Sequence, residues 1–336
     1  MDGLIDSDVD ERGFSVRMGY YLAHASESAY EEHSDWIDEF GPGNRITFFT
    51  RGRFRGLVGF LEKSALLAFR GTQNVENFLT DADTRFVSQF PYPGRVHCGF
   101  AHAIEEVWPE VRRILGSPSR ARPVWITGHS LGGAMATLAS VRLTSEGYKV
   151  RAVYTYGSPR VGDRLFRDSY SLANYRFVND NDLVPHLPFR WCYKHVGKLR
   201  LVNNKGDLTE DQADWVAKKR SLADKAKRVQ RAHRDSTGIL HVFSEFDWLV
   251  DHYINRYLSA IKKLLFQVSS RTRVEQSGGK LCDVLPPLRR LDLALPEVSQ
   301  PFGDRIRRRK LAISETDFIT AFRNQPQGQN WPLRAG

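Results

Sequence analysis

Residues 124–134 read Val-Trp-Ile-Thr-Gly-His-Ser-Leu-Gly-Gly-Ala, and this stretch decides the fold that we predict for the chain. A short apolar run leads into a Gly-x-Ser-x-Gly turn, and small residues then open a helix. A serine on such a sharp strand-to-helix turn has its hydroxyl raised clear of the sheet. Gly128 and Gly132 allow strand and helix to approach closely, because neither carries a Cβ atom. We therefore predict Ser130 as a nucleophile at the positive end of a helix dipole.

Strands and helices alternate along the chain on both sides of this turn. The predicted elements are helices at 13–31 and 99–115 and strands at 46–49, 57–61, 65–69, 150–156 and 175–178. Such alternation favours a mostly parallel sheet with right-handed crossovers, flanked by helices. Functional side chains then gather at the carboxyl ends of the strands.

Several further motifs accompany the serine turn. They are Ala-Phe-Arg-Gly-Thr at 68–72, Val-His-Cys-Gly-Phe at 96–100, Tyr-Gly-Ser-Pro-Arg-Val-Gly-Asp at 156–163 and Asp-Leu-Val-Pro-His-Leu-Pro at 182–188. With Gly-His-Ser-Leu-Gly-Gly at 128–133, this ordered set resembles the class 3 (fungal-type) triacylglycerol lipases, from about Arg12 to Leu265. The resemblance implies the α/β class and the α/β-hydrolase fold. His97, which family members keep, is interpreted as a structural residue.

The resemblance also implies a triad of Ser130, Asp182 and His252. Asp182 stands directly before the Leu-Val-Pro-His-Leu-Pro run and matches the family's position for the acid, whereas Asp180 is interpreted as the cap of a turn. His252 matches the family's Asp-His-x-x-x-x-Tyr pattern for the base. Rival candidates for the base are His186, His233 and His241.

Two backbone N–H groups are predicted to stabilise an oxyanion. In α/β hydrolases one comes from the loop that follows a central strand, and the other comes from the residue after the nucleophile. In this chain they belong to Thr72 and Leu131. The resemblance further implies an amphipathic lid at about 73–86, whose apolar face would line the substrate groove with Val75, Phe78 and Leu79.

We predict a hydrolase domain over residues 1–266, interrupted by a charged helical insertion at about 207–236. The insertion opens with a capping box at Thr209 and is rich in Lys and Arg. Residues 267–336 are predicted to form a basic, partly ordered C-terminal extension, with a loop at 269–272.

Composition limits the class of protein. The 336 residues, 41% of them hydrophobic, suffice for one large core. Three cysteines form neither a closed disulfide framework nor a metal-ligand pattern. Residues 1–11 are acidic without the apolar centre of a signal peptide, and no apolar run approaches the roughly 18 residues of a membrane-spanning helix. We therefore predict no transmembrane segment and favour a cytoplasmic over a secreted location.

The net charge of +10 arises in the C-terminal part. Residues 1–188 carry 21 Lys and Arg against 23 Asp and Glu, so the surplus of 49 over 39 lies beyond them. Such asymmetry fits an anionic lipid or nucleic-acid partner, or a solvated basic surface that keeps the protein soluble. Because the resemblance points to lipid esters, we expect no nucleic acid partner.

Two functions of different class follow. The first is a serine carboxylic-ester hydrolase that forms an acyl-enzyme on Ser130 and needs no metal or cofactor. The resemblance implies lipid esters of the triacylglycerol type at an oil–water or membrane interface. The second is a non-catalytic hydrolase-fold module that binds an anionic membrane surface through its basic C-terminal part. That module predicts a damaged triad, so the presence of all three members favours the enzyme.

Overall fold

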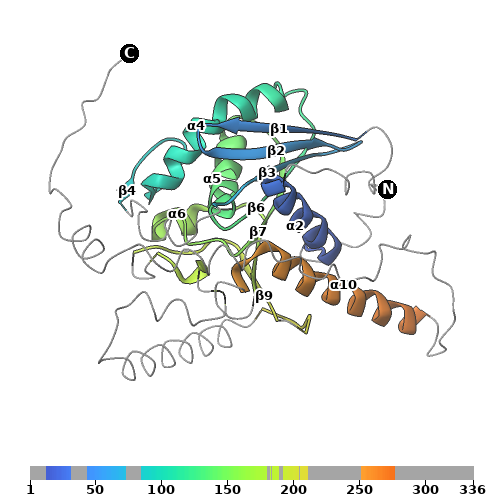
Figure 1. The fold of residues 1–336 in the computed structure, drawn as a ribbon. Helices are drawn as coiled ribbons and strands as arrows, with labels where there is room; N and C mark the ends of the chain where they lie inside the picture. The colour runs from blue at the N-terminus through green and yellow to red at the C-terminus, as the bar shows by residue number, and fades with distance from the viewer. Residues whose placement is uncertain are drawn as a thin grey trace, which may run out of the picture.

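A mixed sheet runs through the part of the chain that the structure describes (Figure 1). The computed structural model describes residues 13–31, 44–72, 85–179, 182, 184–188, 192–203, 205–210 and 251–276. Within these residues, eight strands form one sheet. In spatial order they are β1 (Arg45–Arg51), β2 (Phe54–Phe60), β3 (Ala65–Phe69), β6 (Val124–His129), β7 (Val150–Tyr156), β8 (Asn174–Asn179), β9 (Lys198–Val202) and β10 (Leu208–Thr209).

The centre of this sheet is parallel. Strands β3, β6, β7, β8 and β9 pair in parallel, while β1 and β2 at one edge and β10 at the other pair antiparallel. A separate two-stranded sheet joins β4 (Phe86–Val87) to β5 (Val96–His97). The predicted α/β-hydrolase architecture, with a mostly parallel central sheet flanked by helices, is confirmed.

Helices cover both faces of the sheet, as Figure 1 shows. One face packs against α4 (Cys98–Leu115) and α5 (Leu131–Ser145), with α6 (Arg164–Ser169) on the same side. The other face packs against α2 (Val16–Glu31) and α10 (Ile254–Gln276), which also contact each other.

Strand β3 shows why its sequence is a continuous apolar run. All of its residues are buried. Leu67 and Phe69 point into the core beneath α4 and α5, whereas Leu66 and Ala68 point into the core beneath α2 and α10. Since successive side chains of a strand face opposite ways, a strand covered on both faces needs apolar residues at every position.

Helix α5 lies deep between sheet and helices, which accounts for its small residues. A Cβ atom on Gly132 would lie 2.1 Å from the carbonyl oxygen of Phe69, so only glycine fits where the helix starts. Most of the following turns are buried as well. The small residues that follow the serine therefore bring the helix against the neighbouring strand.

The C-terminal predictions need correction. Helix α10 continues past the predicted domain end at residue 266 to Gln276, so the loop predicted at 269–272 is wrong. No Gly or Pro interrupts residues 267–276, and a helix already held by packing can propagate through polar residues. The predicted insertion at 207–236 begins with strand β10, and its residues 211–236 lie outside the described residues, as do 277–336.

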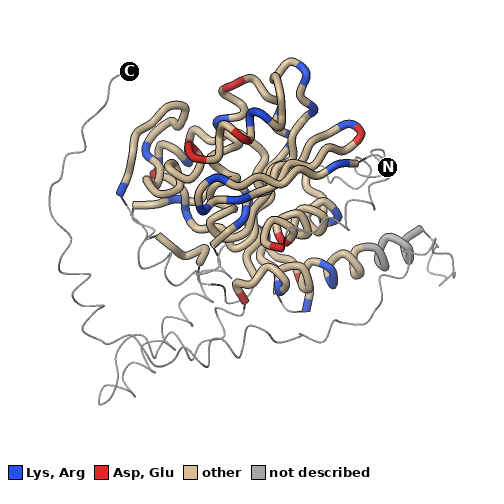
Figure 2. Tube along the Cα trace, turned by 45° about the horizontal axis from the view of Figure 1, so that its top comes forward, with Lys and Arg blue, Asp and Glu red and all other residues tan. Residues whose placement is uncertain are grey.

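Figure 2 shows Lys and Arg spread over the described part of the chain, with Asp and Glu among them. Most of the segment that carries the predicted basic surplus lies outside that part. Of the helices that the structure describes, none combines the length and the apolar character that crossing a membrane requires.

Candidate active site

Ser130 stands between the end of β6 and the start of α5, in a backbone conformation that non-glycine residues rarely adopt. Its φ is +57° and its ψ is −126°, and among the described residues it is the one non-glycine residue with a positive φ. Its N–H donates to the Tyr156 carbonyl over 2.9 Å, and its own carbonyl accepts from the Gly133 N–H. Strain of this kind costs about 1–3 kcal/mol and persists where the surroundings enforce it.

Asp182 and His252, predicted as acid and base, are in contact. His252 Nδ1 lies 2.8 Å from Asp182 Oδ2, and both residues are about 1% exposed. The carboxylate also accepts the N–H of Val184 on Oδ1 over 2.8 Å and the hydroxyl of Tyr257 on Oδ2 over 2.6 Å. Burial, followed by the charge of Asp182, raises the pKa of Tyr257 well above its ordinary value, which keeps this hydroxyl a donor.

Further bonds hold the segments that carry the acid and the base. Asn179 at the end of β8 accepts the N–H of Asp182 on its carbonyl over 2.9 Å. Its side-chain amide donates over 3.0 Å to the carbonyl of Asp251. One asparagine therefore fixes the segments that carry both members of the acid–base pair.

Gly157 leaves the space that this pair occupies. Its φ is +59°, and a Cβ atom there would lie 2.7 Å from Asp182 Oδ2 and 2.9 Å from His252 Nδ1. A side chain at residue 157 would therefore be strained in its backbone and would displace the acid–base pair.

The atoms expected to react are both buried and free. Within the described residues, neither Ser130 Oγ nor His252 Nε2 has a hydrogen-bond partner. The bond between nucleophile and base is thus not formed in this conformation. Such bonds are commonly long before a substrate binds and tighten in the complex.

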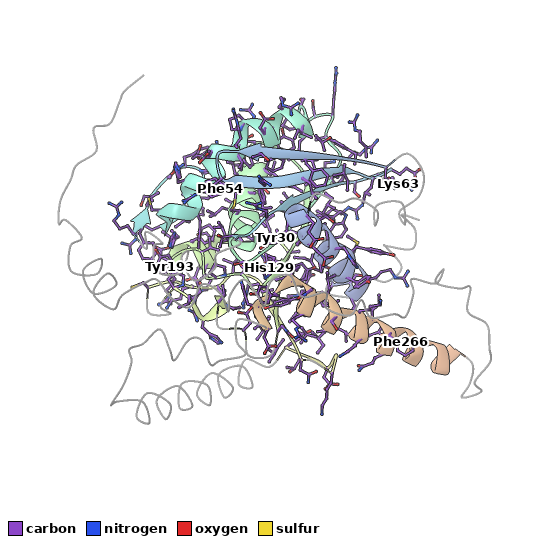
Figure 3. The ribbon with its side chains drawn as sticks, in the orientation of Figure 1. Tyr30, Phe54, Lys63, His129, Tyr193 and Phe266 are labelled. Carbon is purple, nitrogen blue, oxygen red and sulfur yellow. The ribbon has the colours of Figure 1, made fainter. Side chains whose placement is uncertain are left out.

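His129 joins the serine turn to the segment of the base. Its Nε2 lies 2.5 Å from the carbonyl oxygen of His252, so Nε2 carries the proton and donates. Its Nδ1 then accepts from the Tyr30 hydroxyl over 2.8 Å, and Figure 3 shows the two labelled side chains near each other. Burial, and then the nearby His252, lowers the pKa of His129 well below its ordinary value, so the ring is neutral.

The two predicted oxyanion donors belong to segments that meet beside Ser130. Phe69 in β3 pairs with Gly128 in β6, so Thr72 and Leu131 both follow at the carboxyl ends of neighbouring strands. A Cβ atom on Gly71 would lie 3.1 Å from the Ser130 Cβ, which shows how closely the loop approaches the turn. The role of the two N–H groups stays a prediction.

The lid falls almost wholly outside the described residues, which omit 73–84 and with them Val75, Phe78 and Leu79. Its last predicted residue is not helical. Phe86 begins strand β4, and its ring stacks on Tyr193 with centroids 4.2 Å apart. The lid itself stays a prediction.

The other candidate residues are distributed as follows. His186 ends the 3-10 helix η2 (Val184–His186), where its carbonyl accepts from the guanidinium of Arg160. His97 is buried and stacks on Phe100 with ring centroids 4.0 Å apart. Asp180, His233 and His241 lie outside the described residues.

The sheet order, the strained serine turn and the covered parallel core together define an α/β hydrolase. Residues 66–191 match the sequence model of the family described as lipase (class 3). The match covers less than half of the chain, and over this segment the chain is similar to the class 3 lipases.

Individual relatives agree with this family. The chain is 37% identical over 142 residues to secreted mono- and diacylglycerol lipase 1 of Fusarium solani, a match that covers 40% of this chain and 42% of the relative. It is 38% identical over 152 residues to a lipase of Rhizomucor miehei, covering 42% of each chain. The matches thus span about two fifths of the length of these curated relatives.

Among solved structures, one is described by the statement that a serine protease triad forms the catalytic centre of a triacylglycerol lipase. Its TM-score is 0.50 at 26% identity, and the match covers 60% of this chain and 89% of that one.

The relatives correct one prediction from the sequence. A cytoplasmic location was favoured there, but the Fusarium solani relative is named as a secreted lipase. The prediction rested on the composition of residues 1–11 alone.

Proposed function

We propose that this chain is a serine carboxylic-ester hydrolase that acts on lipid esters of the triacylglycerol type. The observation that carries the proposal is the buried contact of His252 Nδ1 with Asp182 Oδ2 at 2.8 Å, together with Ser130 on its strained turn. The lipase names of the relatives support the reaction class, and secretion is carried over from the Fusarium solani relative as part of the proposal.

The chemistry follows from the free atoms of the site. Ser130 Oγ attacks the acyl carbon while His252 Nε2 takes its proton, and the same nitrogen returns the proton to the leaving alcohol. A water molecule, deprotonated by His252, then cleaves the acyl-enzyme. Asp182 orients the Nδ1–H of His252 and stabilises the imidazolium. The N–H groups of Thr72 and Leu131 donate hydrogen bonds to the oxyanion, and each lowers the barrier by about a few kcal/mol.

The neutral state of His129 supports this cycle. Its ring centroid lies 4.6 Å from that of His252. A charge on His129 would repel the imidazolium that His252 becomes during the reaction, and like charges at this distance disfavour protonation. Burial keeps His129 uncharged and leaves that proton transfer unopposed.

Turnover of a short-chain chromogenic ester tests the proposal. We expect Ser130→Ala to lower kcat by about 10⁶-fold, because the nucleophile is lost, with the melting temperature unchanged. Ser140→Ala is the matched control, since Ser140 is also buried but its hydroxyl donates to the Thr137 carbonyl within α5. If wild type and Ser130→Ala turn over equally, the proposal is wrong. An inactive, folded wild-type chain would favour the non-catalytic module.

A second measurement tests the lipid substrate. The predicted lid at 73–86 would leave its closed position only at a lipid surface, because its apolar face needs an apolar contact. Activity on a long-chain ester should then rise sharply once the ester exceeds its solubility limit. A rate that continues smoothly through this limit would remove the lid from the proposal and leave a soluble esterase.

A further inference from the structure

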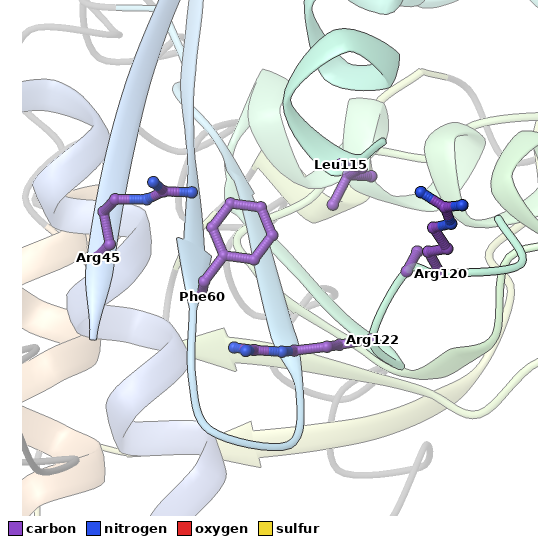
Figure 4. A pocket seen from close by; sticks show the side chains of 6 residues that line it. Arg45, Phe60, Leu115, Arg120 and Arg122 are labelled. Carbon is purple, nitrogen blue, oxygen red and sulfur yellow. The ribbon is translucent and has the colours of Figure 1, made fainter. Parts of the chain in front are cut away.

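A cavity of about 350 Å³ lies at the opposite end of the sheet from Ser130 (Figure 4). Its walls are three arginines and three apolar residues: Arg45, Phe60, Leu115, Arg120, Ala121 and Arg122. The cavity adjoins Val124, where β6 begins, while Ser130 follows the end of that strand. Six residues of strand separate the two sites by roughly 20 Å. The cavity is therefore distinct from the candidate active site.

The fold holds this cavity in shape. Arg45, Phe60, Ala65 and Val124 follow one another across four paired strands, so the β side of the cavity belongs to the sheet. The other side is the end of α4 and the turn that follows it. In that turn the N–H groups of Arg120 and Ala121 both donate to the Ser117 carbonyl, over 3.0 and 2.9 Å.

The guanidinium groups of the three arginines have no acidic partner among the described residues. The guanidinium of Arg45 lies 5.3 Å from the centroid of the Phe60 ring, and the guanidinium of Arg122 donates to the carbonyl of Leu61. Figure 4 shows Arg122 beside Phe60, with Arg120 across from it near Leu115. No acidic residue lines the cavity, and within the described chain none of the three arginines forms an ion pair.

The guanidinium groups and the apolar lining of the cavity together favour a ligand with an anionic head and an apolar body. Guanidinium groups present planar forks of donors that match the oxygens of carboxylates and phosphates. Phe60, Leu115 and Ala121 add an apolar wall, which an inorganic anion would not use. A volume of about 350 Å³ is at the lower end of the range for small-molecule sites.

We propose that this cavity is a binding site for a small amphiphile with an oxyanionic head, either a carboxylate or a phosphate. The head lies among the guanidinium groups of Arg45, Arg120 and Arg122, and the apolar body lies against Phe60 and Leu115. The proposal does not depend on the reaction at Ser130.

Titration calorimetry on the full chain tests it with octanoate, octyl phosphate, octanol and inorganic phosphate. The variant is the double change Arg45→Gln with Arg120→Gln, which keeps the polar side chains and removes two charges. The matched control is Arg53→Gln on the same hairpin, where the guanidinium likewise lies over an aromatic ring, 5.1 Å from the centroid of Phe54. Melting temperatures verify that each variant is folded.

We expect octanoate, octyl phosphate or both to bind the wild type, octanol not to bind, and inorganic phosphate to bind at least tenfold more weakly. The preferred head group identifies the source of the ligand. The double variant should weaken binding by about tenfold or more, since charge-assisted bonds are lost, while Arg53→Gln binds as the wild type does. Equal binding of octanol, equal binding of inorganic phosphate, or unchanged affinity in the double variant would each overturn the proposal. Ester turnover by the double variant should equal that of the wild type.

Discussion

The carboxyl and amino ends of strands β3 and β6 differ in whether the charged side chains near them have ionisable partners. At the carboxyl end the carboxylate of Asp182 is buried and bonded to His252, Tyr257 and the N–H of Val184. At the amino end three arginines surround a cavity with no acidic residue in its lining. A site that performs chemistry needs fixed geometry, whereas a site that captures an anion needs unused donors. Both kinds of site can lie on one sheet because different loops form its two ends.

After the loss of the nucleophile itself, the largest effect expected at the carboxyl end concerns the acid. Asp182→Asn should lower kcat by about 10⁴-fold, because an amide cannot hold the His252 ring in the state that accepts a proton on Nε2. The measurement is ester turnover by the purified variant. Asp180→Asn is the control and should stay near the wild-type rate. If Asp180→Asn loses about 10⁴-fold in kcat and Asp182→Asn stays near the wild-type rate, Asp180 is the acid of the site.

A smaller effect separates backbone strain from damage to the site. Gly157→Ala adds a Cβ atom 2.7 Å from Asp182 Oδ2 at a φ of +59°, so we expect a loss of about 2–4 kcal/mol in unfolding free energy together with most of the activity. Gly116→Ala, at the end of α4 beside the arginine cavity, has a φ of +75° with nothing within 4 Å of the added atom. It should lose about 1–3 kcal/mol, from backbone strain alone, and no activity. Denaturant titration measures the stability of both variants, and ester turnover measures their activity. Equal losses of activity in Gly157→Ala and Gly116→Ala would contradict the view that only the carboxyl end holds the active site.

The smallest effect is a pH dependence that belongs to the carboxyl end. Burial lowers the pKa values of His129 and His195, so both rings stay neutral in the folded protein below pH 6.5 while the unfolded chain takes up protons. The unfolded state then binds more protons, and stability falls as the pH falls from 6.5 toward 5, by up to about 1.4 kcal/mol per pH unit for each ring.

His129→Gln should therefore reduce this slope by about one proton, which denaturant titrations at several pH values measure. The control is His102→Gln on the surface of α4, where the side chain is 68% exposed. An unchanged slope in His129→Gln would mean that the ring is charged in the folded protein.

The sequence predicted the centre of the fold because periodicity and local turn chemistry coincide there. The run at 65–69 is apolar and the run at 150–156 is rich in β-branched and aromatic residues, and both are strands with the predicted bounds. The same holds for Ser130, since glycines and a strand mark its turn. The edge strand β10 and the small sheet of β4 and β5 were missed, because strands of two residues carry too few positions to show a period. Strand β9 was missed too, since its Lys-Leu-Arg-Leu-Val sequence places charged residues in a strand that is almost wholly buried.

Within the site, the sequence suggested Asp182 and His252 but not the residues that hold them. Tyr30 reaches His129 from a helix 99 positions earlier in the chain, and Asn179 reaches Asp251 from 72 positions away. Such partners are set by tertiary packing and have no local pattern of their own. His129 was visible inside the Gly-His-Ser motif, and a histidine next to a nucleophile is the signal that could have drawn attention to it.

The bond from Asn179 to the Asp251 carbonyl has a consequence for how this chain can change. It fixes the point at which the chain returns to the sheet after residues 211–250, and the bonds of His252 to Asp182 and His129 fix the next residue. Residues 251 and 252 are thus positioned by bonds of their own to the described core. Doubling the length of a connection costs only about 0.6 kcal/mol. We therefore expect that sequence exchanged between residues 210 and 251 leaves the base in its place.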